Sequence, residues 1–227
     1  MSSSLQKIFP SSLEQKILKT DLWDEAKNTR ILMWAAHQGA KVFGIDISIR
    51  ILKDAEKTFA GKKLEKGFIL SDLRNIGFKN ESFDYIYSMG TIEHFPEFRQ
   101  AIAECYRVLK KGGVAVIGVP NKFDPFLRPL FISFLSAFHL YAYGEEKAFG
   151  MKALEEMLKE TGFQILGRSG ILFMPGWLRM ADLFLYVRWP KSKYFMAPLI
   201  SFFSFLYSKF PLLRRQGYLI ACAVQKP

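Results

Sequence analysis

The chain has 227 residues, half of them hydrophobic, which is enough to bury a substantial core in one large domain. This composition excludes a globally disordered protein. Its two cysteines, Cys105 and Cys222, stand far apart in apolar segments without a CxxC spacing. That pattern argues against a disulfide framework or a metal site and favours reduced thiols in the core of a cytosolic protein.

The chain is basic, and its charge is unevenly distributed. Lys and Arg number 32 against 21 Asp and Glu, a formal net charge of +11. The last acidic residue is Asp182. The cations that follow it are Arg188, Lys191, Lys193, Lys209, Arg214, Arg215 and Lys226. A basic segment of this kind suggests an anionic membrane surface, a nucleic acid or an acidic substrate, although general solubility would also account for it.

No targeting or membrane-spanning segment is predicted. The N-terminal residues are polar and lack the apolar stretch of a secretory signal. The two longest uncharged runs, residues 129–144 and 194–208, are shorter than the roughly 18–20 residues that span a bilayer. We therefore expect a cytoplasmic protein, with association at the inner surface of the membrane as the form that any membrane contact would take.

Hydrophobic periodicity and turn residues predict strands that alternate with helices over the first half of the chain. The expected strands are residues 16–22, 41–46, 67–71, 83–88 and 113–119. The expected helices are residues 30–38, a segment beginning near Ile49, and residues 96–110. Ser48 is placed to cap the second helix, and Gly39 and Gly112 to end the first and third. The alternation predicts an α/β fold of the Rossmann-like, doubly wound type, with a mostly parallel sheet.

Aromatic residues become frequent after Asn121. Residues 127–143 have helical length with little polar face, and residues 151–160 form an amphipathic helix that ends at Gly162. A strand is expected from Gln164, and residues 217–226 are expected to form a closing strand. We predict one domain over residues 1–227, in which residues 122–150 and 170–215 form hydrophobic cap or insertion segments.

Four blocks carry a family resemblance. They are KVFGIDIS from Lys41, GFILSDLRNIGF from Gly67, SFDYIYSMGTIEHF from Ser82 and RVLKKGGVAVIGVPN from Arg107. In order and spelling they closely resemble class I S-adenosylmethionine-dependent methyltransferases of the type 11-like group. The resemblance implies a seven-stranded sheet with a final antiparallel strand, and S-adenosylmethionine as the cofactor.

The resemblance assigns the adenosine half of the cofactor to two places. Asp46, with Ile47 after it, occupies the position at which the family's acidic residue accepts hydrogen bonds from the two ribose hydroxyls. One carboxylate suits two adjacent donors, and charge-assisted bonds are strong. Asp72 and Leu73 are similar to the family's acidic and apolar pair that recognises adenine. The structural alternatives are a helix-capping Asp46 and a turn-forming Asp72.

The methyl end of the cofactor is assigned to Met89 and Gly90, because this position in the family faces the methyl donor. Gly90 would permit close approach of the backbone. His94 follows Glu93 and is the candidate general base, since histidine titrates near neutral pH. Capping and packing are the competing interpretation of His94.

The first motif departs from the family pattern. A glycine-rich loop is expected after the first strand, yet residues 16–26 are KILKTDLWDEA and contain no glycine. Lys19 aligns with the family's acidic position, and acidic or bulky residues stand where glycines belong. Either the loop is rebuilt, with Thr20, Asp21 or Asp24 binding the cofactor's ammonium group, or cofactor binding is lost, or the first strand is misaligned. We favour the rebuilt loop because Asp46, Asp72 and Gly90 are retained.

The sequence thus predicts methyl transfer from S-adenosylmethionine to a small acceptor that is apolar or lipid-linked. The alternative is a non-catalytic, methyltransferase-like scaffold that acts through its hydrophobic, basic surface. For the aromatic and basic segments, contact with an anionic membrane competes with a lid over the sheet and with a dimer interface. A nucleic-acid partner is disfavoured, because the aromatic residues form uninterrupted apolar runs and no RNA-binding module is present.

Overall fold

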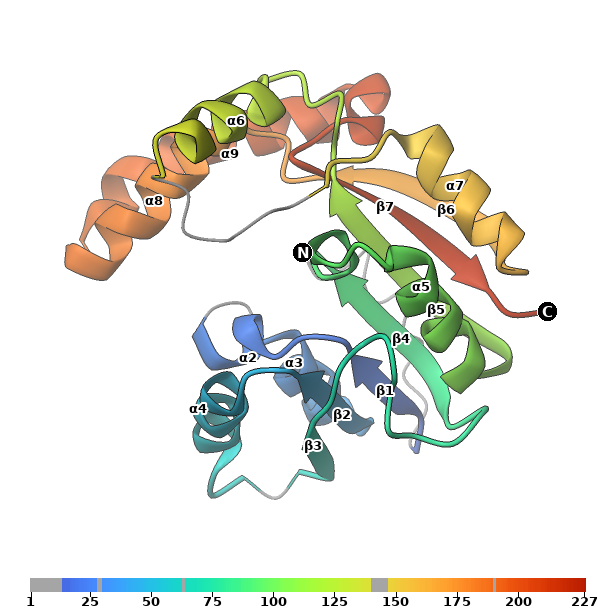
Figure 1. Cartoon of the computed structure of the whole chain (residues 1–227). Coiled ribbons are helices and arrows are strands. Elements are labelled where there is room, and N and C mark those ends of the chain that lie inside the picture. The colour runs from blue at the N-terminus through green and yellow to red at the C-terminus, as the bar shows by residue number, and fades with distance from the viewer. Residues whose placement is uncertain (1–13, 28–29, 63, 140–146, 190) are drawn as a thin grey trace. The chain divides into compact units, whose positions relative to one another are not determined.

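The structure is a computed structural model that describes residues 14–27, 30–62, 64–139, 147–189 and 191–227. Its strands form a seven-stranded sheet in the order β3-β2-β1-β4-β5-β7-β6 (Figure 1). The strands are β1 (Lys16–Lys19), β2 (Lys41–Asp46), β3 (Lys66–Leu70), β4 (Phe83–Met89), β5 (Leu109–Pro120), β6 (Gln164–Ile171) and β7 (Leu219–Gln225). The α-helices are α2 (Trp23–Lys27), α3 (Ile31–His37), α4 (Ile49–Phe59), α5 (Phe98–Val108), α6 (Arg128–Ala137), α7 (Met151–Glu160), α8 (Gly176–Arg188) and α9 (Ser192–Lys209). Two 3₁₀ helices are η1 (Ile92–His94) and η2 (Pro211–Arg215). The predicted Rossmann-like α/β fold is confirmed.

The strand directions follow the predicted pattern. β1 lies parallel between β2 and β4, and β2 lies parallel to β3 with Asp46 opposite Leu70. β7 runs against β5. At one end the Gly112 amide donates to the Lys226 carbonyl, and at the other the Asn121 amide donates to the Tyr218 carbonyl. The sheet is therefore parallel over β1–β4 and closes with an antiparallel strand.

The described residues divide into two compact units. The first comprises those up to Ile117 together with Met157–Leu166 and Ala223–Pro227, and the second comprises those of Gly118–Glu156 and Gly167–Cys222. The first unit contains β1 to β4 and the helices α2 to α5. The second contains α6, α8 and α9. All the candidate cofactor residues named from the sequence therefore belong to the first unit.

The core of the first unit forms because α3 and α4 each present one apolar stripe to the parallel strands. Leu32 of α3 and Leu52 and Phe59 of α4 pack with Ile17 and Val42 of the sheet in one buried cluster. α4 begins where predicted, because Ser48 accepts a hydrogen bond from the Ile51 amide and satisfies one free donor of the first turn. These contacts fix the end of β2, from which Asp46 projects.

Two boundaries at the ends of strands differ from the sequence prediction. The first strand was expected to reach Leu22 but ends at Lys19, and the short helix α2 follows at Trp23. The Leu22 amide donates to the carboxylate of Asp46 at 3.0 Å instead of continuing a sheet ladder. A side chain from β2 thus ends β1, and this long-range contact left no signal in the local pattern.

The third predicted helix was expected to reach Lys110, yet α5 ends at Val108 and Gly112 lies within β5. Leu109 is already extended, and Gly112 has a φ of +74°, a value that favours glycine. Hydrogen bonds between the Gly112–Gly113 segment and Lys226 draw these residues into the sheet. Pairing with the last strand of the chain therefore overrides the helical periodicity here.

Elements of the second half largely follow the prediction. α7 spans the predicted residues 151–160, and Gly162 after it has a φ of +105°. α6 ends at Ala137, and the part of its predicted range over residues 140–143 lies outside the described residues. Among the helices that the structure describes, none is both long and apolar enough to cross a membrane.

The contribution of the sheet–helix core can be measured at Ile102, which is fully buried on α5. We expect Ile102→Ala to lower the free energy of unfolding by about 2–5 kcal/mol, because it removes buried methylene groups and leaves a cavity. Ile49→Ala is the matched control, since that isoleucine is 51% exposed. Urea denaturation measures both, and equal losses for the two variants would contradict the assigned core.

Candidate active site

The candidate residues gather at one edge of the sheet because the carboxyl ends of parallel strands meet there. In the register of β1 to β4, Lys19 lies opposite Gly44 and Tyr87, and Asp46 lies opposite Leu70. The segments that follow these strand ends begin at Thr20, Ile47, Ser71 and Gly90. In open α/β sheets this edge is where ligands bind. The structure thus brings the sequence-predicted positions onto one edge.

Asp46 links two segments at this edge of the sheet through hydrogen bonds. Its Oδ2 accepts a hydrogen bond from the Leu22 amide at 3.0 Å, and its Oδ1 accepts one from the Ser48 amide at 2.8 Å. The carboxylate therefore joins the loop after β1 to the start of α4. A carboxylate offers about four acceptor sites. Two backbone donors thus leave each oxygen able to accept a further hydrogen bond.

Apolar side chains flank Asp46 on the exposed edge. Ile47, which follows Asp46, is 64% exposed, and Leu70, which lies opposite Asp46 across the β2–β3 pair, is 55% exposed. Large apolar side chains that remain exposed beside a polar anchor are typical of a ligand contact surface. The sequence prediction included Ile47, whereas Leu70 was missed. Its position at the end of β3 was the available signal.

The loop after β1 is built around a buried lysine. The side chain of Lys19 is fully buried, and its Nζ donates to the Asp21 carbonyl at 2.9 Å and to Asp21 Oδ1 at 3.2 Å. Asp24 Oδ2 lies 3.9 Å from the same nitrogen. Burial alone would lower the pKa of Lys19, but the carboxylates of Asp21, Asp24 and Glu25 outweigh it and raise that pKa. Lys19 is therefore a cation held by an acidic loop.

A set of hydroxyl groups links this loop to the end of β4. Thr20 Oγ1 donates to Ser88 Oγ at 2.8 Å and lies 3.4 Å from Thr91 Oγ1. Thr91 in turn donates to Asp21 Oδ2 at 3.3 Å. Thr20 and Asp21 thus lie beside the residues that flank Met89 and Gly90. Ser88 and Thr91 were missed by the sequence analysis, although they stand on either side of the predicted Met-Gly pair.

Asp72 has a strong protein partner. Arg74 donates from Nη2 to Asp72 Oδ2 at 2.7 Å and from its backbone amide to Oδ1 at 2.8 Å. The hydrogen bonds from Arg74 hold the pKa of the Asp72 carboxyl below its usual value. Arg74 also pairs with Glu97 at 2.8 Å and stacks on the Phe95 ring at 4.9 Å. Leu73 is only 2% exposed, so its side chain belongs to the core.

The segment after β4 supplies the remaining candidates. Gly90 has a φ of +72°, a backbone conformation that explains the glycine there. Met89 is partly buried at the end of β4. His94 lies in η1 with 36% of its side chain exposed, and its Nε2 is 4.0 Å from the buried Glu93 Oε1.

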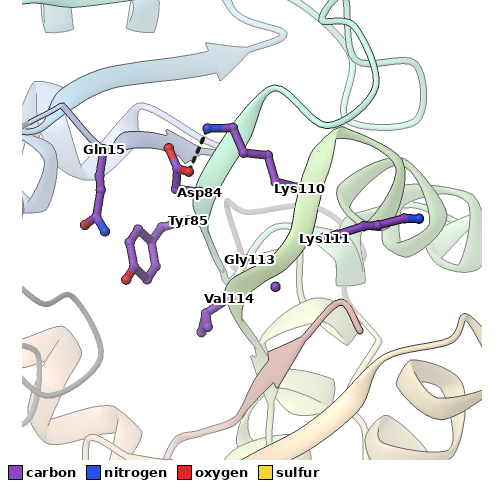
Figure 2. A pocket seen from close by; sticks show the side chains of 8 residues that line it. Gln15, Asp84, Tyr85, Lys110, Lys111, Gly113 and Val114 are labelled. Carbon is purple, nitrogen blue, oxygen red and sulfur yellow. Dashed lines mark hydrogen bonds and ion pairs between the residues drawn. The ribbon is translucent and has the colours of Figure 1, made fainter.

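A different cavity lies at the opposite edge. It has a volume of about 220 Å³ and is lined by residues at the starts of β4 and β5, among them Asp84, Tyr85, Lys110 and Lys111. Figure 2 shows the ion pair between Lys110 Nζ and Asp84 Oδ1, at 2.7 Å, in its wall. These are the amino ends of the strands, away from the edge at which α/β sheets bind ligands. We therefore place the candidate site at Asp46 and not in this cavity.

Comparison with known proteins agrees with the geometry. A family model described as "Methyltransferase domain" matches residues 27–117, a range that begins after the loop containing Lys19 and includes Asp46, Asp72 and Gly90. Residues 27–117 therefore match a methyltransferase-domain family. The match leaves the altered first motif outside its range.

Curated relatives and solved structures are similar to this chain as well. It is 31% identical over 143 residues to demethylmenaquinone methyltransferase of Thermotoga maritima, covering 55% of this chain and 60% of that relative. Phosphoethanolamine N-methyltransferase 2 of Haemonchus contortus, solved with S-adenosyl-L-methionine, superposes with a TM-score of 0.66 at 21% identity, over 98% of this chain and 51% of that one. A cyclase superposes with a TM-score of 0.67 at 16% identity, over 99% of this chain and 78% of that one.

These matches have a limited reach. The chain spans about 60% or less of the length of the first curated relatives that it matches. At identities under 25%, the structural likeness establishes the fold alone. The cyclase illustrates the point, because the same fold carries a different named activity there. Activity must therefore be argued from the residues of the site.

The coupling between Lys19 and Asp21 can be measured by a double-mutant cycle. Lys19→Met should lower the free energy of unfolding by about 3–5 kcal/mol, because it leaves the buried Glu25 and the partly buried Asp21 and Asp24 without their cation. In the Lys19→Met/Asp21→Asn protein the loss of unfolding free energy should differ from the sum of the two single losses by about 1–3 kcal/mol. Urea denaturation provides the values. Lys53→Met, at an exposed lysine of α4, is the control and should change stability by less than about 0.5 kcal/mol. Additive effects would contradict the pairing.

Glu25 makes stability depend on pH. Its Oε1 accepts from the Leu32 amide at 3.0 Å and its Oε2 has no hydrogen-bond partner among the described residues. Burial raises the pKa of this carboxyl above its ordinary value despite the nearby Lys19. The stability that Glu25 contributes is therefore fully present below pH 4.5 and is lost as the pH rises through the folded-state pKa.

We accordingly expect Glu25→Gln to gain stability relative to the wild type as the pH rises from about 4.5 to 7. Urea denaturation of both proteins at several pH values gives the difference, in which other titrating groups cancel. A difference that is constant over this range, or that moves the other way, would show that Glu25 titrates normally.

Proposed function

We propose that the protein transfers a methyl group from S-adenosylmethionine to a small acceptor that is apolar or lipid-linked. The observation that carries this proposal is the arrangement around Asp46. A carboxylate at the end of β2 retains accepting capacity for two hydroxyl donors, and the exposed side chains of Ile47 and Leu70 lie beside it. This combination of one polar anchor and apolar surface suits a nucleoside.

The residues present fit the cofactor along its length. Asp46 would accept the ribose hydroxyls, and Ile47 and Leu70 would contact the adenine ring. Asp72 would meet the adenine amine with whatever accepting capacity Arg74 leaves. Its carboxylate already receives several bonds from Arg74, so we assign it the weaker role of the two aspartates.

The methionine end of the cofactor is assigned to the rebuilt loop. A free amino acid carries an ammonium group, and the loop after β1 holds Asp21, Asp24 and Glu25 against the single buried cation of Lys19. Asp21 Oδ2 also accepts from Thr91, so this carboxylate is oriented toward the end of β4. Charge would thus replace the close backbone approach that a glycine loop provides.

When bound, S-adenosylmethionine supplies an electrophilic methyl group on its sulfonium. The protein's own contribution is to hold and orient. Gly90 would allow the chain to pass close to the reacting end, and Met89 would line it with a polarisable apolar group. Correct placement of the two reactants supplies much of the rate of such a transfer.

His94 is the group we assign to proton removal from the acceptor. Its partly exposed imidazole follows Gly90 by four residues, and Glu93 Oε1 lies 4.0 Å from its Nε2. An imidazole placed there would take up the proton that the acceptor loses when it attacks the methyl group. This role applies where the acceptor is a hydroxyl or another group that must be deprotonated.

The nature of the acceptor is proposed from the composition of the second unit. Many of its large apolar residues are exposed, among them Phe123, Trp177 and Phe195. The relative from Thermotoga maritima is named for demethylmenaquinone, which supports a small-molecule acceptor. In this proposal the acceptor is apolar and the protein meets it at the inner face of an anionic membrane. The basic surface of the protein would make that contact. A non-catalytic scaffold is not favoured, because the structural role of Asp46 does not account for the exposed apolar side chains of Ile47 and Leu70 beside it.

Calorimetry with S-adenosylmethionine and with its demethylated product tests this function. We expect the wild type to bind both, and Asp46→Asn to weaken binding by more than about tenfold, because charge-assisted hydrogen bonds to a ligand are lost. Asp84→Asn is the matched control. Asp84 also accepts a backbone hydrogen bond, from the Lys16 amide, but it lies at the opposite edge of the sheet.

Thermal unfolding of the two variants separates binding from stability, since Asp46 also anchors two backbone amides. Failure of the wild type to bind either compound would favour the scaffold. Equal binding by wild type and Asp46→Asn would remove Asp46 from the site.

A further inference from the structure

Helix α9 has two apolar faces, and only one of them is used in packing. Met196 is 4% exposed and packs with Met174 and Leu178, and the partly buried Ile200 and Phe203 join the same cluster. These contacts attach α9 to α8 and the segment before it (Figure 1). One apolar stripe is sufficient to hold a helix against its neighbours. The second stripe therefore needs another explanation.

The second face is exposed and continuous. Phe195, Leu199, Phe202 and Phe205 are 77%, 42%, 54% and 57% exposed. Their spacings of four, three and three residues place them along one side of the helix. We call these four residues the α9 stripe. Contiguous exposed apolar surface of this size marks an interaction site in soluble proteins.

Cations border the α9 stripe. Lys191 and Lys209 stand four residues before Phe195 and four residues after Phe205, so both fall on the side of the helix that carries the stripe. Both are exposed. Lys193 in the first turn of α9 adds a further cation, and the neighbouring segments add Arg188, Arg214 and Arg215. From Leu183 to the end of the given chain there is no Asp or Glu to offset them. The stripe thus lies in a surface of one charge sign.

Aromatic rings accompany these cations outside the stripe. The Arg188 guanidinium lies 4.6 Å from the Phe184 ring centroid, and the Lys193 ammonium lies 5.0 Å from that of Tyr194. Tyr194 is 73% exposed. Aromatic and basic side chains together are characteristic of the layer between lipid headgroups and acyl chains, where each has an apolar body and a polar end.

We propose that α9 docks along the surface of an anionic membrane, with the α9 stripe inserted among the acyl chains and the flanking cations at the phosphate layer. The helix has 18 residues and is therefore about 27 Å long. It lacks the apolar length to cross a bilayer, as reported above, and the exposed Ser201, Ser204 and Ser208 fall outside the stripe on the helix surface. An amphipathic helix of this kind lies in the plane of the interface.

Charge decides between a membrane and the other occupants. A symmetric second copy would bring the same six cations against these six, which opposes dimerisation through this face. A nucleic acid would match the charge, but it requires aromatic residues spaced for base stacking, not four apolar side chains in one stripe. An anionic bilayer satisfies both properties at once.

This inference extends the proposed function, since membrane contact would bring the protein to an apolar acceptor, but its test involves no methyl transfer. The full-length protein is sedimented with vesicles of neutral phosphatidylcholine, with or without about 30 mol% phosphatidylserine, at low and high salt. We expect binding to the anionic vesicles at low salt, at least about tenfold weaker binding to the neutral ones, and weakening by added salt.

Two pairs of variants separate the apolar and the charged contributions. Phe195→Ser/Phe202→Ser should weaken binding more than about tenfold, because two phenylalanines no longer enter the apolar layer. Leu166→Ser, at a 51% exposed residue of β6, is its control and should have little effect. Lys191→Glu/Lys209→Glu should weaken binding similarly, whereas Lys152→Glu/Lys159→Glu on α7 makes the same change in net charge and should stay within about twofold.

Several outcomes would overturn the proposal. The wild type failing to bind anionic vesicles would do so, as would equal loss in the two lysine pairs, which would reduce the effect to net charge. Light scattering that showed a dimer abolished by Phe195→Ser/Phe202→Ser would assign the stripe to self-association. Calorimetry with S-adenosylmethionine on the same variants should be unchanged, so a failure of cofactor binding and a failure of membrane binding remain distinguishable.

Discussion

The site depends on how the ammonium group of Lys19 is compensated in the interior of the first unit. The residue lies at the end of β1, fully buried, and a cation there is stable only if carboxylates surround it. Asp21 and Asp24 come from the adjacent loop and supply that charge. The loop cannot then adopt the open, glycine-rich form of the family, because its side chains are committed to the lysine. Lys19 and the acidic residues of the loop therefore form one electrostatic unit.

Asp46 connects this altered loop to the unaltered part of the site. By accepting from the Leu22 and Ser48 amides, it fixes the loop after β1 relative to the start of α4. The same residue is the anchor that the family uses for the cofactor ribose. The carboxylate has enough acceptor sites for these two amides and for the ribose hydroxyls that we propose it binds. In that proposal one residue anchors both the loop after β1 and the adenosine half of the cofactor.

In the first unit a buried charge has to be compensated, whereas in the second unit exposed apolar side chains have to be covered. α9 uses Met196 and its neighbours to pack, yet carries a second stripe of similar apolar content. A helix that is apolar on both sides is stable only where both sides are covered. The surrounding cations and the absence of acidic residues after Asp182 restrict what can cover the second side. An apolar surface alone would suit a membrane and a second copy of the chain equally well. The excess of cations favours the anionic membrane.

Local pattern was sufficient for the fold and for most of the site positions. Alternating strands and helices, the Ser48 cap and the acidic residue at the end of β2 are properties of short segments, so the sequence alone located β2, α4, α7 and Asp46. The end of β1, the start of β5 and the partner of Thr20 were decided only in the folded protein. Each depends on a contact between distant residues: Leu22 with Asp46, Gly112 with Lys226, or Thr20 with Ser88. A sequence pattern shows which residue types follow one another in a segment. The hydrogen-bond partners of those residues depend on which strands become neighbours in the sheet.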